Sequence, residues 1–167
     1  MKGEEYVLDG VSRDGQYKIT AIWKYDKRSV NDANFVYYGM KLCDGNGALE
    51  KEMMAYGEKV CAAVGIFQGP SHMEIMNCSD GPCLVEVGSR CHGGEGTWLP
   101  VAKECIGYTQ VEATLNCYLR PELYVPTRIA QARIMLLFRA MAISLYCRSR
   151  IRPAQIQAQV RGLIVYV

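Results

Sequence analysis

The stretch GPSHMEIMNCSDGPCLVEVGSRCHGGEG, residues 69–96, decides the fold. Strand-forming residues at 72–77 and 83–90 flank the sequence SDGP at 79–82, whose composition is typical of a tight turn. A glycine-rich loop, CHGGEGT at 91–97, follows the second strand. The stretch therefore predicts an antiparallel hairpin that leads into a loop.

The predicted hairpin also holds the residues with the most evident chemistry. Side chains alternate between faces along a strand, so His72 and Glu74 share one face, and Glu86, Gly88 and Arg90 share one face of the returning strand. If these faces coincide, two carboxylates, an imidazole and a guanidinium converge. Paired carboxylates can hold Mg²⁺ on substrate phosphates, and an arginine would neutralise phosphoryl charge. The alternative for each acid alone is a solvated strand residue, but Glu86 lies in the apolar run LVEVG, where an unpaired buried charge is costly.

Further elements are expected on both sides of this hairpin. An Asp14-Gly15 turn predicts a second hairpin, and apolar residues spaced by three and four predict an amphipathic helix that ends at Gly65. The expected strands are 5–12, 16–25 and 34–40, and the expected helices are 48–64, 101–105 and 109–119.

The length of 167 residues and the 50% hydrophobic content are those of one folded domain. The charged residues, however, are unevenly distributed along the chain. Residues 1–119 have a net charge of −5, whereas residues 120–167 have eight arginines, no lysine and a net charge of +7. We therefore separate residues 1–119 from an Arg-rich apolar tail, 120–167, of uncertain origin. A basic surface helix and a misread exon or shifted reading frame both explain the tail.

The cysteines and the apolar segments indicate a cytoplasmic protein without a membrane span. Several of the eight cysteines stand in apolar runs as small hydrophobic residues, and no secretory signal precedes them, so reduced thiols are expected. The longest apolar stretch, 134–147, is short and contains Arg139. A zinc site is disfavoured, because the candidate ligands lack CxxC or HxxxH spacing: Cys91, His92, His72, Cys78 and Cys83.

The run 69–96, with GEEYVLDGVS at 3–12, resembles the C-terminal lobe of the ATP-grasp carboxylate-amine ligases, particularly the L-amino-acid ligase branch. The resemblance covers about residues 3–119. It implies an α+β fold in which an antiparallel sheet with flanking helices forms one wall of a nucleotide cleft. It also implies a reaction in which ATP, with Mg²⁺ or Mn²⁺, phosphorylates a carboxylate, after which an amine attacks the acylphosphate.

The resemblance assigns roles to particular residues. Glu74 and Glu86 match the pair that holds the metal on the ATP phosphates, and Arg90 matches the arginine that meets the γ-phosphate or the acylphosphate. Glu5 resembles the acid that binds the ribose hydroxyls. His72 lies where relatives place a cationic or hydrogen-bonding residue near the transferring phosphoryl group. For His72 two alternatives remain, a base for the attacking amine and a hydrogen-bonded structural residue.

Two glycine positions qualify this assignment. Gly88 stands where many members of the family have a metal-binding asparagine, so that ligand is absent, although the EVGSR form is similar to one found in the amino-acid ligase branch. In the loop, the backbone N–H groups of Gly93 and Gly94 could bind a phosphate or substrate anion beside Arg90. The loop could equally serve only to turn the chain.

In the family, a smaller lobe and a hinge strand precede the region that is matched here. The expectation is therefore an incomplete cleft, a fragment with little turnover alone, and a missing N-terminal half that is supplied in cis or by a partner chain. Two other functions stay open: a non-catalytic nucleotide-binding or regulatory protein, and binding of RNA or a membrane surface by the tail. Because a basic apolar tail binds anions nonspecifically, no specific nucleic acid is expected.

Overall fold

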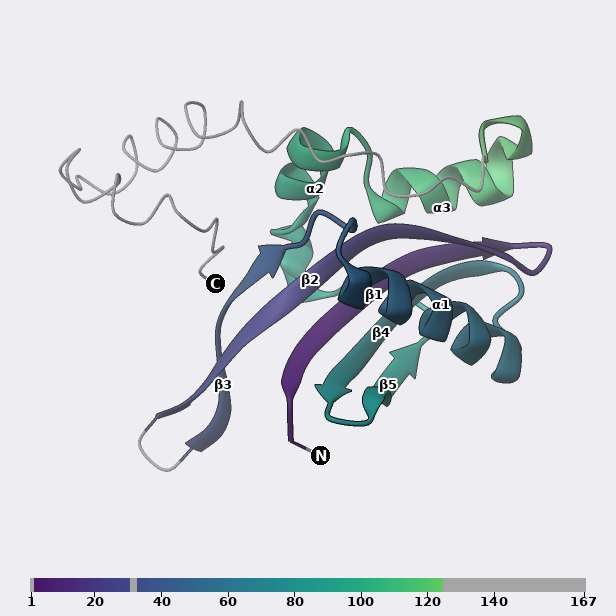
Figure 1. The fold of residues 1–167 in the computed structure, drawn as a ribbon. Helices are drawn as coiled ribbons and strands as arrows, with labels where there is room; N and C mark the ends of the chain where they lie inside the picture. The colour runs from purple at the N-terminus through teal and green to yellow at the C-terminus, as the bar shows by residue number, and fades with distance from the viewer. Residues whose placement is uncertain (1, 31–32, 125–167) are drawn as a thin grey trace, which may run out of the picture.

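A computed structural model describes residues 2–30 and 33–124 of the chain. Five antiparallel strands form one sheet in the order β3-β2-β1-β4-β5, so β1 lies at its centre (Figure 1). The strands are β1 (Glu4–Arg13), β2 (Gln16–Val30), β3 (Ala33–Leu42), β4 (Gly69–Cys78) and β5 (Gly81–Gly88). The helices are α1 (Ala48–Ala63), α2 (Leu99–Ile106) and α3 (Gln110–Leu119), with short 3-10 turns η1 (Gly94–Gly96) and η2 (Pro121–Leu123).

Both predicted hairpins are present, and their turns follow from backbone geometry. Asp14 and Gly15 have φ values of 50° and 77°, the left-handed conformation that a two-residue turn between twisted strands requires. The second turn comprises Ser79 and Asp80, because β4 ends at Cys78 and β5 begins at Gly81. The strand boundaries differ from the expected ones: β5 ends two residues before Arg90, and β2 continues five residues past Tyr25.

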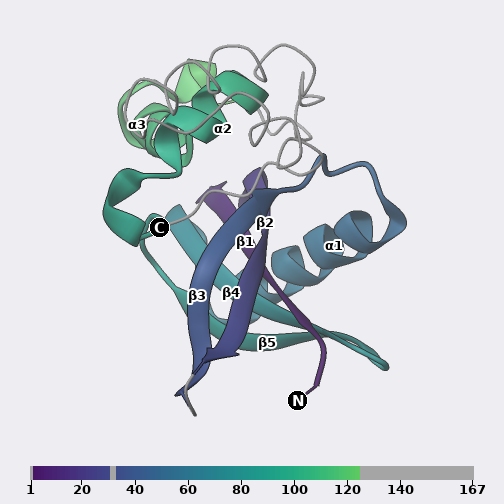
Figure 2. The ribbon, with the colours of Figure 1, turned by 90° about the vertical axis from the view of Figure 1, so that its left-hand side faces the viewer.

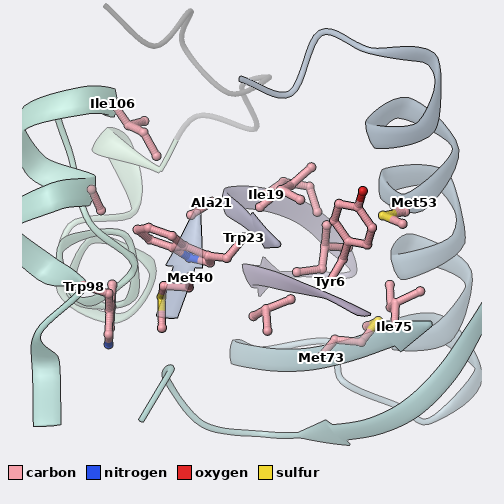
Figure 3. Close-up of a cluster of buried hydrophobic side chains, with 14 of the residues drawn as sticks. Tyr6, Ile19, Ala21, Trp23, Met40, Met53, Met73, Ile75, Trp98 and Ile106 are labelled. Carbon is pink, nitrogen blue, oxygen red and sulfur yellow. The ribbon is translucent and has the colours of Figure 1, made fainter. Parts of the chain in front are cut away.

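Helix α1 covers one face of the sheet. Gly57 is buried in this helix, and a Cβ atom there would lie 2.3 Å from Cδ2 of Leu8 in β1, so the glycine allows the helix to approach the strand closely. Apolar side chains from the helix and from the central strands fill the space between them (Figure 3). The largest of these include Leu8, Ile22, Met53, Met73 and Ile75, each less than 2% exposed.

Helices α2 and α3 lie together, away from α1 (Figure 2). The N-cap Thr109 of α3 forms a capping box with Glu112, which satisfies the first N–H groups of the helix. The side chain of the next residue, Gln110, donates to the carbonyl oxygens of Gly10 and Ser71 at 3.0 and 2.8 Å. These hydrogen bonds attach the start of α3 to the backbones of β1 and β4.

Residues 125–167, which make up most of the Arg-rich tail, lie outside the described part of the chain. The two explanations of the tail and the boundary at residue 119 therefore stay predictions. Of the described helices, none has both the length and the apolar character needed to cross a bilayer.

Candidate functional site

The β4–β5 hairpin brings the two predicted metal-binding acids together. Glu74 lies directly opposite Glu86, and His72 lies opposite Gly88. Cross-strand partners point to the same face of a sheet, so the two carboxylates share one face. His72 Nε2 lies 3.8 Å from Glu74 Oε1, and Arg90 Nη2 lies 3.8 Å from Glu86 Oε1. The side chain of Glu74 is 13% exposed and that of Glu86 is 57% exposed, so the pair extends from the interior to the surface.

A β-bulge makes this pairing possible. Between the turn and Ile75 the strands pair in a regular register, which begins with Cys78 opposite Gly81 and ends with Ile75 opposite Leu84. The register then shifts by one residue, because Val85 has no partner, and Glu74 pairs with Glu86. Without the extra residue, Glu74 would pair with Val85 and Glu86 would point to the opposite face. The bulge is therefore the feature that gives the hairpin a shared acidic face.

Two neighbouring strands add a third acid and a lysine. Lys27 Nζ lies 2.5 Å from Glu5 Oε1 and 3.8 Å from Glu74 Oε2, so it bridges the two carboxylates. Burial raises the pKa of Glu5, the nearby Glu74 raises it further, and the bond to Lys27 opposes both. The neighbouring His72 holds the pKa of Glu74 at about 2, against burial. Glu74 is therefore ionised at neutral pH.

A cavity of about 520 Å³ opens beside these residues. Glu5 and Lys27, which both interact with Glu74, are among its lining residues. Its volume lies within the range of about 300–1,000 Å³ that is usual for small-molecule sites. The remaining lining residues combine charged side chains with apolar and aromatic ones: Gly3, Glu4, Lys24, Tyr25, Asp26, Met40, Lys41 and Met76.

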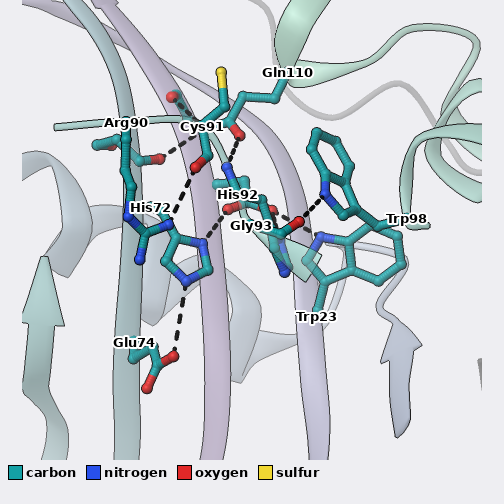
Figure 4. Close-up of polar contacts among 12 residues, drawn as sticks. Trp23, His72, Glu74, Arg90, Cys91, His92, Gly93, Trp98 and Gln110 are labelled. Carbon is teal, nitrogen blue, oxygen red and sulfur yellow. Dashed lines mark hydrogen bonds and ion pairs between the residues drawn. The ribbon is translucent and has the colours of Figure 1, made fainter. Parts of the chain in front are cut away.

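Asp9, which was not predicted as a site residue, is fully buried and lies at hydrogen-bond distance from His72. Figure 4 shows three side chains that contact it, those of Trp23, His72 and His92. His72 Nδ1 lies 2.9 Å from Asp9 Oδ1, and His92 Nδ1 lies 2.7 Å from Asp9 Oδ2. Trp23 Nε1 donates to Asp9 Oδ2 at 2.9 Å. We call Asp9, Trp23, His72 and His92 the Asp9 cluster. Burial would raise the pKa of Asp9, but the bonds to both histidines lower it below its usual value.

The Asp9 cluster influences the acid pair through His72. Burial lowers the pKa of His72, but the contacts with Asp9 and Glu74 outweigh this effect and raise it to about 9. His72 is therefore an imidazolium at neutral pH. The result is an alternating row of charges that leads from buried Asp9 through His72 to Glu74.

Within the described residues, the Asp9, His72 and His92 side chains form the one group of three or more potential ligands whose atoms lie within 4.8 Å of one another. Their geometry is better explained by hydrogen bonds than by a metal. Both Nδ1 atoms are at hydrogen-bond distance from the carboxylate, and Trp23 supplies it with a third donor. None of the cysteines weighed as zinc ligands belongs to this group.

The glycine-rich loop starts at the Asp9 cluster. The backbone N–H of His92 donates to Gln110 Oε1 at 2.8 Å, and Trp98 Nε1 donates to the carbonyl oxygen of Gly93 at 2.8 Å. The rings of His92 and Trp98 stack with centroids 5.2 Å apart. Gly93 and Gly94 are exposed beyond this anchored start. The structure thus fixes the place of the loop, and anion binding by its N–H groups stays a prediction.

The sequence contains little local signal for the Asp9 cluster. Asp9 stands before Gly10 in VLDGV, where an Asp-Gly pair usually indicates a turn, and His92 was assigned only to a glycine-rich loop. Asp9 is 63 residues from His72 and 83 residues from His92, so only the sheet topology brings them together. A clue was available in the position of an acid within an apolar strand, the same argument that singled out Glu86.

Comparison with known proteins gives a consistent family. No family model matches the chain. Dapdiamide A synthase from Enterobacter agglomerans is 33% identical over 125 residues, which cover 75% of this chain and 29% of that protein. The L-amino acid ligase from Bacillus licheniformis superposes with a TM-score of 0.58 at 24% identity, and the match covers 70% of this chain and 30% of that one.

Two more distant solved structures share the fold. An ATP-grasp superfamily protein from Archaeoglobus fulgidus has a TM-score of 0.53 at 15% identity, with 70% of this chain and 35% of that chain covered. The N5-carboxyaminoimidazole synthase from Aspergillus clavatus, solved with ADP and an aminoimidazole ribonucleotide, has a TM-score of 0.56 at 18% identity, with 78% and 32% covered.

The chain therefore spans about a third or less of the length of each of these proteins. The match to dapdiamide A synthase and the shared fold both confirm the resemblance inferred from residues 3–119, as does the antiparallel sheet with its flanking helices. The described part of this chain therefore has the ATP-grasp fold.

Proposed function

We propose that this chain is the ATP- and metal-binding part of a carboxylate-amine ligase that acts on an amino acid through an acylphosphate. The observation that supports it most is the pairing of Glu74 with Glu86 across the hairpin, with Arg90 and the cationic His72 beside them. The names of the relatives, a dapdiamide A synthase and an L-amino acid ligase, indicate the same general chemistry. The amine and the carboxylate substrates are small molecules in this proposal.

The cavity beside the acid pair would hold the nucleotide. Glu5 lines it and, in this proposal, accepts hydrogen bonds from the ribose hydroxyls. The phosphates would then extend from Glu5 toward Glu74, because Lys27 contacts both acids and marks the short path between them. Gly93 and Gly94 would offer backbone N–H groups near the end of the phosphate chain.

The donor set fits a hard divalent cation, Mg²⁺ or Mn²⁺. Both candidate ligands are carboxylates, which such ions prefer, and the low pKa of Glu74 keeps that ligand ionised. Glu86 is exposed enough to be reached from solvent. Gly88, opposite His72, offers no side-chain ligand, so the site has two protein carboxylates. Glu74 and Glu86 would hold the ion, which would offset negative charge on the phosphates.

The proposed reaction has two steps. A carboxylate oxygen attacks the γ-phosphorus, the bond to the β-phosphate oxygen breaks, and ADP leaves. The amine nitrogen then attacks the acyl carbon, phosphate leaves with the bonding electron pair, and the amine loses a proton. Arg90 and His72 would stabilise charge on the transferring phosphoryl group. Because His72 has a pKa of about 9, the cationic role is favoured over that of a base for the amine.

Binding and turnover are separable in this proposal. The relatives contain long regions that this chain does not match, and a complete ligase would draw part of its nucleotide cleft from such a region, in cis or in a partner chain. The 167-residue chain would accordingly bind Mg·ATP and turn it over little. We place it in the cytoplasm, where free thiols such as those of Cys61 and Cys105 stay reduced.

Calorimetric titration of the full chain with Mg·ATP tests the proposal. We expect saturable binding that weakens at least about tenfold when EDTA removes the metal, because the acid pair would lose the ion that joins it to the phosphates. The double variant Glu74→Gln with Glu86→Gln should remove this metal dependence. Binding of equal strength with and without metal would contradict the proposed site.

A matched control keeps the same change in net charge. Glu58 in α1 and Glu104 in α2 are both exposed, so Glu58→Gln with Glu104→Gln removes two negative charges away from the acid pair. This control should bind Mg·ATP like the wild type. If it weakens binding as much as the double variant of the acid pair, general electrostatics would explain the effect.

A further inference from the structure

We propose that Asp9 is a positioning residue. It holds the His72 imidazole and the glycine-rich loop, both of which would lie near the ATP phosphates, in one fixed arrangement. The inference rests on the proposed function for its ligand, although the geometry that supports it does not involve one. Asp9 itself is fully buried and does not line the cavity beside Glu5 and Lys27, so it would act through its neighbours rather than touch a substrate.

The first part is the orientation of His72. Its ring has two nitrogens, and the contact of Nδ1 with Asp9 Oδ1 leaves Nε2 directed at Glu74. The His72 side chain is only 4% exposed, so water offers it few competing partners. A ring flip would exchange the buried carboxylate contact for an unpaired nitrogen, which is costly in the interior. Asp9 thus selects the orientation in which His72 faces the acid pair.

The second part is the anchoring of the loop. His92 is held in three ways: its Nδ1 contacts Asp9 Oδ2, its backbone N–H donates to Gln110 Oε1, and its ring stacks on Trp98. Gln110 is itself bonded to the backbones of β1 and β4. Gly93 follows His92 directly. The position of the exposed glycines is therefore fixed by the contacts of the buried histidine before them.

The chemistry of the carboxylate explains why one residue can serve both parts. An ionised carboxylate accepts several hydrogen bonds, and Asp9 accepts from both imidazoles and from Trp23. An asparagine of the same size has one acceptor oxygen and one donating NH₂ group, so it cannot accept from donors on both sides. Asp9→Asn therefore keeps the volume but removes the negative charge and one acceptor oxygen, so at least one imidazole can no longer donate to residue 9.

Amide hydrogen exchange of the full chain tests the positioning without any ligand. In Asp9→Asn we expect the amides of His92 and Thr97, which are bonded to Gln110 and Gly94 in the structure, to exchange at least about tenfold faster. Exchange in α1, on the opposite face, should stay unchanged. Unchanged exchange in the loop, or equal acceleration in the loop and in α1, would overturn the proposal.

A pair of variants at His92 covers the case in which Asp9→Asn does not fold. His92→Asn retains an N–H donor near the place of Nδ1, whereas His92→Leu retains only the bulk. We expect His92→Asn to preserve loop protection better than His92→Leu, by about tenfold in exchange rate. Equal exchange in these two variants would show that the hydrogen bond to Asp9 does not position the loop.

Nucleotide binding separates this inference from the proposed function. Asp9→Asn should weaken Mg·ATP at least about tenfold and leave AMP, which lacks the β- and γ-phosphates, unchanged, whereas a general loss of structure would weaken both. If the wild-type chain does not bind Mg·ATP, the proposed function fails, and the exchange experiments still decide whether Asp9 positions the loop. Equal weakening of both nucleotides would overturn the positioning role.

Discussion

The charge on His72 gives a sharp prediction about stability and pH. Its pKa is about 9 in the folded chain, against an ordinary value of 6.5, because Asp9 and Glu74 outweigh burial and the repulsion from Arg90. A group with a raised folded pKa stabilises the fold fully below its unfolded pKa, and this contribution falls as pH rises toward the folded pKa. The wild-type chain should therefore lose stability between pH 6.5 and pH 9.

The size of the loss follows from the same values. Each pH unit between the unfolded and folded pKa values removes about 1.36 kcal/mol. The thiols of an unfolded chain are half ionised near pH 8.5, so over the range from pH 6.5 to 8.5 the histidine is isolated by comparing the wild type with a variant that lacks it. Across that range the histidine alone should lower the free energy of unfolding by about 2–3 kcal/mol. This is a large share of the 5–15 kcal/mol that is typical of a domain.

Urea unfolding at pH 6.5 and pH 8.5 measures this difference. Trp23 and Trp98 are both buried, so their fluorescence should report the transition. In His72→Gln the fall should be smaller than in the wild type by about 2 kcal/mol, because the titrating imidazole is absent. A wild-type stability that is constant or rises over this range would refute the reasoning, as would an equal fall in His72→Gln.

Three smaller predictions concern individual contacts. Gly10→Ala should cost about 1–3 kcal/mol of unfolding free energy in urea, because its Cβ would lie 2.3 Å from the ring of Tyr17. Thr109→Ala should cost about 1 kcal/mol in the same assay through loss of the capping box, whereas Thr109→Ser should cost less. Equilibrium dialysis with Zn²⁺ should find no tight site that His92→Asn removes, because the Asp9 carboxylate already contacts both Nδ1 atoms and Trp23 Nε1. Finding such a site would show that the cluster binds metal.

Most of the fold could be predicted because its signals are local. The Asp14-Gly15 and Ser79-Asp80 turns each lie between strand-forming residues, and α1 has regular apolar spacing, so the order of elements follows from short windows of sequence. The ends of strands were less accurate. Lys27, two residues past the expected end of its strand, pairs with Glu5 only because β2 continues.

The candidate site was predictable to the extent that it lies within one hairpin. Glu74, Glu86, His72 and Arg90 are close in the chain, and both the alternation of the strands and the family resemblance single them out. Asp9 could not be joined to them from the sequence, because its partners arrive through the pairing of β1 with β4 and through the loop after β5. Long-range pairings of this kind have no local signal.

The β-bulge at Val85 sets a rule for the length of the hairpin. In a regular hairpin closed by two residues, opposite positions are separated by an odd number, as Cys78 and Gly81 are separated by three. Glu74 and Glu86 are separated by twelve, and the bulge accounts for the change from odd to even. Inserting or deleting one residue between them would turn one acid to the wrong face, whereas a change of two residues, one in each strand, would leave both in place. This hairpin should therefore accept changes in length only in pairs.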